Sequence, residues 1–143
     1  MPRRIPQLAA WVRSRPWRED RGDASIQMAI IYPFVLLLAV AVIQASMWYY
    51  AREIALTAAR EGLSEARTYK AGPGDGIQRA REVLDRTAGD SLLNSSVSTA
   101  GSTGQRIRIQ VSGTAQSMLP GVPGLRITQS ASGTVERWTV PGE

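Results

Sequence analysis

The most prominent pattern along the chain is an uninterrupted apolar run near its N-terminal end. From Ala24 to Ala51 there are 28 residues without a charged side chain. As a helix, this run measures about 42 Å, whereas the hydrocarbon core of a bilayer is about 30 Å thick. Trp48, Tyr49 and Tyr50 close the run, as expected where a membrane helix reaches the interface. The pattern therefore predicts a transmembrane helix.

Beyond the apolar run, small residues continue at helical spacing. Only Gly62 disfavours a helix between Arg52 and Tyr69. A small-residue stripe with the spacing i, i+3, i+4, i+7 and i+11 consists of Ala55, Ala58, Ala59, Gly62 and Ala66. We therefore expect one helix over residues 23–70. Its stripe has two interpretations, because it would either seat a small domain or pack against a neighbouring helix.

Four residues inside the apolar run bear on how this helix assembles with others. Pro33 lacks a backbone donor and predicts a kink. Ala41 and Ala45 form a small-xxx-small pair that allows a partner helix to approach closely. Gln27 lies near the N-terminal end of the run, where its amide either reaches water or bonds to a neighbouring chain.

The C-terminal part, residues 71–143, predicts a small α+β domain. The sequence AGPGDG at 71–76 is typical of a turn, and 77–89 is amphipathic, with Ile77, Ala80, Leu84 and Ala88 on one face. Residues 106–115 alternate strictly between polar and apolar side chains. In residues 125–135, the apolar side chains Leu125, Ile127, Ala131 and Val135 all fall at odd-numbered positions, as in a third strand. Residues 93–99 form a weaker strand pattern. The fold class expected is a long N-terminal transmembrane helix that extends into one short helix and a roughly three-stranded antiparallel sheet.

Charge is concentrated ahead of the helix. The chain carries a formal +5. Residues 1–23 hold six arginines against three acidic side chains, whereas Arg52 and Glu53 are balanced beyond the helix. Positive charge stays on the cytoplasmic side, so we expect a single-pass protein of the cytoplasmic membrane with its N-terminus inside and its domain outside. The high pI is partly an effect of this arm, and no nucleic-acid partner is expected.

The composition narrows the possible chemistry. The chain has no cysteine and no histidine. This excludes disulfides, thiolate nucleophiles, zinc sites of the usual kind and histidine-based acid–base catalysis. No nucleophile-elbow motif is present. We therefore expect no enzyme activity, no cofactor and no metal.

A conventional secretion signal fits the pattern poorly. The sequence AVA at 39–41 satisfies the small-x-small rule for a cut site. The apolar run continues directly after it as VIQASMWYY, where a cleaved signal would end. A start of the mature chain at Val42 is therefore not expected.

The residues RGDASIQMAIIYPFVLLLAVAVIQ, followed by LTAAREGLSEAR, resemble the TadE-like family of pseudopilin-like proteins from tight-adherence (Flp-type) pilus assembly. Arg21 and Gly22 match the end of the basic leader, Pro33 matches the proline of the helix, and 58–62 match the second block. The resemblance covers roughly residues 21–67. The plan of a protruding helix and a small sheet is also similar to that of pilin-like proteins.

The resemblance implies a prepilin peptidase cut between Gly22 and Asp23. Residues 1–22 would then be a basic cytoplasmic leader. Gln27 would be the fifth mature residue, where pilin-like proteins usually carry a glutamate that pairs with a neighbouring subunit's N-terminal amine. A glutamine accepts a hydrogen bond from an ammonium but supplies no charge, which weakens this contact and suggests a minor or initiating component.

The function implied is a minor pilin-like structural or assembly component of a Tad pilus. Its expected partners are the membrane, other pilin-like subunits, pilus-assembly membrane proteins and the prepilin peptidase. The alternative is an uncleaved single-pass anchor that presents a small extracytoplasmic binding domain. The two differ at the glycine junction, because only the first requires Gly22.

Overall fold

The computed structural model of the protein describes residues 20–135, with side chains from Ser25 onward. The element order is α1 (Asp20–Ala66), α2 (Pro73–Thr87), the 3₁₀ turn η1 (Gly89–Ser91), β1 (Leu92–Ser98), β2 (Arg106–Ala115) and β3 (Leu125–Thr134). The chain divides into two units, residues 1–40 and 41–143. The predicted α+β layout of a long apolar helix, a short helix and a three-stranded antiparallel sheet is confirmed.

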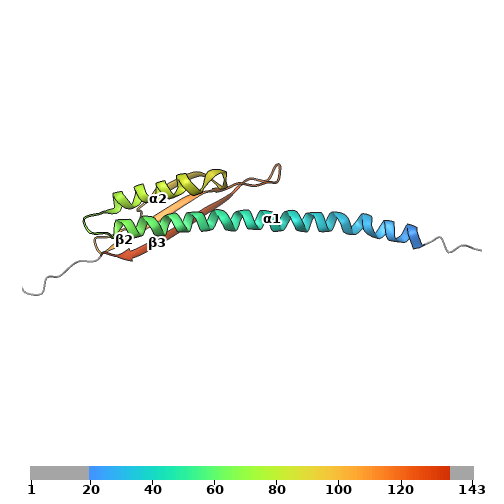
Figure 1. The fold of residues 1–143 in the computed structure, drawn as a ribbon, viewed down its shortest axis with the longest axis horizontal. Helices are drawn as coiled ribbons and strands as arrows, with labels where there is room; N and C mark the ends of the chain where they lie inside the picture. Colours follow the sequence, from blue (N-terminus) through green and yellow to red (C-terminus); the bar gives the residue numbers. More distant parts are fainter. Residues whose placement is uncertain (1–19, 136–143) are drawn as a thin grey trace, which may run out of the picture. The chain divides into compact units, whose positions relative to one another are not determined.

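Helix α1 changes character along its length. Every side chain from Ser25 to Ile43 is exposed, and Pro33 lies inside the helix. The kink expected at Pro33 stays a prediction. From Ala51 onward one side of α1 is buried in the core of the second unit. In that unit, α2 and this part of α1 lie side by side, with strands of the sheet behind them (Figure 1).

Helix α2 begins earlier than the sequence predicted. Residues 73–76 form its first turn, so the interpretation of 71–76 as a turn is wrong for these four residues. Pro73 occupies a position where its missing N–H costs nothing, since the first helical donors have no partner within the helix. The Asp75 carboxylate accepts a hydrogen bond of 2.8 Å from the Gly72 N–H, and this fixes the start of α2.

The sheet is an antiparallel meander in the order β1-β2-β3. The odd-numbered positions of β2 face the helices, and among them Ile109 and Val111 are fully buried. The opposite face is polar, with Ser96 and Ser112 hydroxyls 2.8 Å apart and an Arg108–Ser130 hydrogen bond of 3.0 Å. The predicted alternation of β2 is therefore confirmed.

A β-bulge explains why the first strand was hard to recognise. Leu93 pairs with Thr114 but Ser96 pairs with Ser112, so β1 carries one extra residue. Asn94 takes a positive φ of 50° there, which asparagine tolerates better than most residues. Because of this insertion, Leu92 and Val97 are both buried although they are separated by an odd number of positions.

The backbones of α1 and α2 approach each other closely at two glycines. A Cβ placed on Gly62 would lie 2.5 Å from the Gly76 carbonyl oxygen and 2.9 Å from the Ala80 Cβ. A Cβ placed on Gly76 would lie 2.6 Å from the Gly62 carbonyl oxygen and 2.7 Å from the Ala66 Cβ. Each helix therefore needs a residue without a side chain at the same contact.

We expect Gly76→Ala to destabilise the domain by about 1–3 kcal/mol, because the added methyl group must push the two helices apart. Gly74→Ala is the matched control on the same helix, since a Cβ there meets nothing within 4 Å. The control should be neutral or stabilising by up to about 1 kcal/mol. Thermal unfolding of the full chain in detergent, followed by circular dichroism, measures both; equal midpoints for the two variants would contradict the close contact.

Candidate membrane and assembly surface

The exposed apolar surface of α1 is the dominant candidate site. The large apolar side chains from Ile26 to Tyr50 are exposed apart from Met47, and Phe34 is 70% exposed. The span Ser25–Ala66 is long and apolar enough, by length and composition, to cross a membrane. An apolar surface of this extent is unfavourable in water and matches the requirements of a helix in lipid. This helix suggests membrane anchoring.

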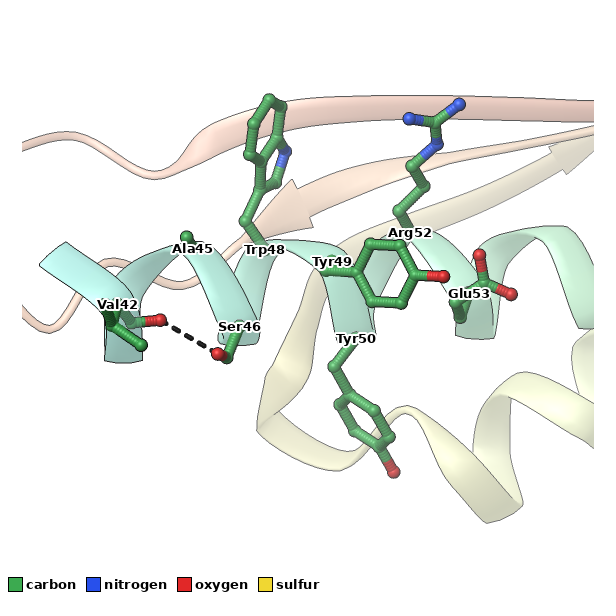
Figure 2. Close-up of a pocket in the computed structure, with 8 residues that line it drawn as sticks. All are labelled: Val42, Ala45, Ser46, Trp48, Tyr49, Tyr50, Arg52 and Glu53. Atoms are coloured by element: carbon green, nitrogen blue, oxygen red, sulfur yellow. Dashed lines mark hydrogen bonds between the residues drawn. The ribbon is translucent and has the colours of Figure 1, made fainter.

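An open groove lies on α1 where the apolar segment ends. It has a volume of about 820 Å³, and its lining includes the small residues Ala45 and Ser46 between Val42 and the aromatic residues that follow. Figure 2 shows Trp48 and Tyr50 projecting to different sides of the helix, and Ser46 turned back to the Val42 carbonyl oxygen at 2.8 Å. Ala41 is also exposed. The Ala41–Ala45 pair is therefore not covered by the described part of the chain.

Gln44 joins α1 to the loop between β2 and β3. Its Oε1 accepts a hydrogen bond of 3.0 Å from the Met118 N–H, and its Nε2 lies 3.5 Å from the Gln116 carbonyl oxygen. This contact joins residues more than 70 positions apart. It fixes the height of the loop along α1.

The predicted assembly residues near the N-terminus fall in the exposed part of α1. Gly22 and Asp23 belong to its first turns, and their side chains lie outside the described residues. Gln27 is exposed, one turn beyond Asp23. Pro33 is also exposed, and no described feature tests the roles of Gln27 and Pro33, so these roles stay predictions.

The small-residue stripe lies in the core of the chain's own domain. Ala55, Ala58 and Ala59 have no exposed surface, Ala66 is 2% exposed and Gly62 is buried against α2. Ala51 and Ile54, which the sequence did not single out, extend the same buried face. At this height, the small residues are covered by α2 and the sheet of the same chain.

Ionic and metal-binding features are sparse in the part of the chain that the structure describes. Arg79 contacts Glu61 and Glu82, each at 3.4 Å, and because all three side chains are at least partly exposed to solvent, these pairs contribute little stability. Within residues 20–135, no buried polar side chain is found, nor any group of three acidic residues placed to hold a metal. The described domain is therefore held together by apolar packing.

A family model described as "TadE-like protein" matches residues 22–63. This segment is TadE-like. The match begins at Gly22, and it confirms the resemblance expected from the sequence. The TadE-like family is a structural and assembly component of Tad pili and not a known class of enzyme, so the match suggests a pilus-associated component. No curated protein and no solved structure matches the chain.

We expect Gln44→Leu to loosen the loop between β2 and β3. The variant removes the acceptor of the Met118 N–H, and a hydrogen bond of this kind contributes about 0.5–1.5 kcal/mol. Amide hydrogen exchange of a peptide spanning 116–124 should become faster by about 2- to 10-fold. Ser46→Ala is the control, because that hydroxyl bonds within α1. Equal exchange in both variants would show that the hydrogen bond between Gln44 and Met118, the tether, does not hold the loop.

Proposed function

We propose that this protein is a minor pilin-like subunit of a Tad pilus, held in the membrane by α1 until it is incorporated. The main support is the match of residues 22–63 to the TadE-like family. This match begins at Gly22, the glycine of the proposed cleavage junction. The uncovered apolar surface of α1 supports the same role, because a pilin-like helix must reside first in lipid and then among other helices.

The proposed orientation places the N-terminus in the cytoplasm and the sheet domain outside. It rests on the six arginines of residues 1–23 and on the near balance of charge after the helix. The prepilin peptidase would cut after Gly22, and Asp23 would become the first residue of the mature chain. The protein would act without catalysis, through contacts with pilin-like subunits and pilus-assembly membrane proteins.

The surfaces available for those contacts follow from the burial of α1. Because the stripe from Ala55 to Ala66 is covered by the chain's own domain, this side of α1 has no room for another helix. The exposed pair Ala41 and Ala45 lies N-terminal to the part of α1 that the domain covers, and it permits close approach of a neighbouring helix. We therefore assign lateral helix contacts to the apolar segment and domain seating to the stripe.

Gly22→Leu should block maturation. A peptidase that needs a small residue before the cut would leave a chain heavier by the 22 leader residues, measurable by intact mass of the protein from its host membranes. Ala29→Leu is the control, because it adds the same side chain within the exposed helix but away from the junction. Full-length mass in the parent protein would instead favour the uncleaved anchor.

Gln27→Leu should lower incorporation into filaments, because leucine cannot accept a hydrogen bond from a neighbouring N-terminal ammonium. Gln27→Glu should retain or raise incorporation, since it supplies both an acceptor and a charge. The amount of this chain in sheared pili, relative to the amount in membranes, reports the effect. Equal ratios for the leucine and glutamate variants would rule out this contact.

A further inference from the structure

We propose that the β2–β3 loop together with the first residue of β3, residues 116–125, is a second lipid contact, seated in the membrane interface on the domain's side of the bilayer. The inference rests on the proposed anchoring of α1. It adds that the domain does not stand clear of the membrane but touches it at one defined loop.

The loop has the surface of an interfacial segment. Its ten residues, QSMLPGVPGL, contain no charge. Met118, Val122 and Leu125 are 62%, 51% and 50% exposed, and Leu119 is 39% exposed. The turn at the other end of β2, residues 99–105, contains no residue larger than Gln and is polar throughout apart from Ala100 and two glycines. Apolar exposure in the hairpin turns is thus confined to one end of the sheet.

The tether to Gln44 sets the height of this loop on the membrane helix. Gln44 lies four residues before Trp48, so the Met118 N–H is held about 6 Å below the start of the aromatic group Trp48–Tyr50. Such aromatic residues mark the level of the lipid headgroups. Interfacial segments bury their apolar face about 5–10 Å into the headgroup and acyl boundary, which is the depth of the tether.

The backbone of the loop is also suited to a water-poor environment. Pro120 and Pro123 have no N–H to satisfy. The N–H groups of Met118, Leu119 and Val122 donate to Gln44 Oε1, Ser117 Oγ and the Leu119 carbonyl oxygen, respectively. Since unpaired backbone donors are costly in contact with hydrocarbon, these bonds lower the cost of placing the loop at the acyl boundary.

The test uses the full chain in vesicles of phosphatidylethanolamine and phosphatidylglycerol. Because the chain has no cysteine, a single introduced cysteine provides one site for an environment-sensitive fluorophore. Four variants are needed: Met118→Cys, Val122→Cys, Leu37→Cys and Ala100→Cys. Leu37 reports anchoring of α1, and Ala100 lies in the hairpin turn at the opposite end of β2, about 30 Å away. Quenching by lipids that carry a spin label high or deep on the acyl chain gives the depth.

We expect the Met118 and Val122 labels to be quenched at least about twofold more strongly than the Ala100 label, and more by the shallow than by the deep spin label. Loop labels as weakly quenched as Ala100, with Leu37 strongly quenched, would overturn this inference and leave anchoring intact. Loop labels with blue-shifted emission but no lipid quenching would indicate cover by protein and would also overturn it. An unquenched Leu37 label would refute anchoring and the loop contact together.

Discussion

The contact between Gly62 and Gly76 is the constraint on which the domain depends. Two helix backbones meet there with no side chain between them, and this proximity allows Ala58, Ala59 and Ala80 to be fully buried. The sheet then closes the same core, since Ile109 Cδ1 reaches within 3.1 Å of where a Gly76 Cβ would stand. A core of small residues has little apolar area per side chain, so close approach supplies the packing that larger side chains would otherwise provide.

Helix α1 therefore meets two environments. From Ser25 to Ile43 its side chains are exposed and mostly apolar, and from Ala51 one face belongs to the domain core. Gln44 and the groove near Ala45 lie in the transition between these parts. The proposed role in a pilus uses this division, because lateral contacts fall to the apolar segment while the domain remains seated on the buried face.

The elements that the sequence predicted correctly are those with a local period. The apolar run predicted the helix α1, and the strict alternation from Ile107 to Ala115 predicted the strand β2. The start of α2 was missed because Pro73 and Gly76 are typical of turns, although one suits a helix start and the other a close contact. The contact between Gln44 and Met118 has no local pattern at all, since it follows from how the hairpin lies on the helix.

The most direct test of the proposed function is quantitative mass spectrometry of sheared pili from the host. We expect peptides of this chain in the filament fraction, with an N-terminal peptide that begins at Asp23, at a small fraction of the amount of the major pilin. A chain that retains Met1 and is confined to the membrane fraction would contradict it.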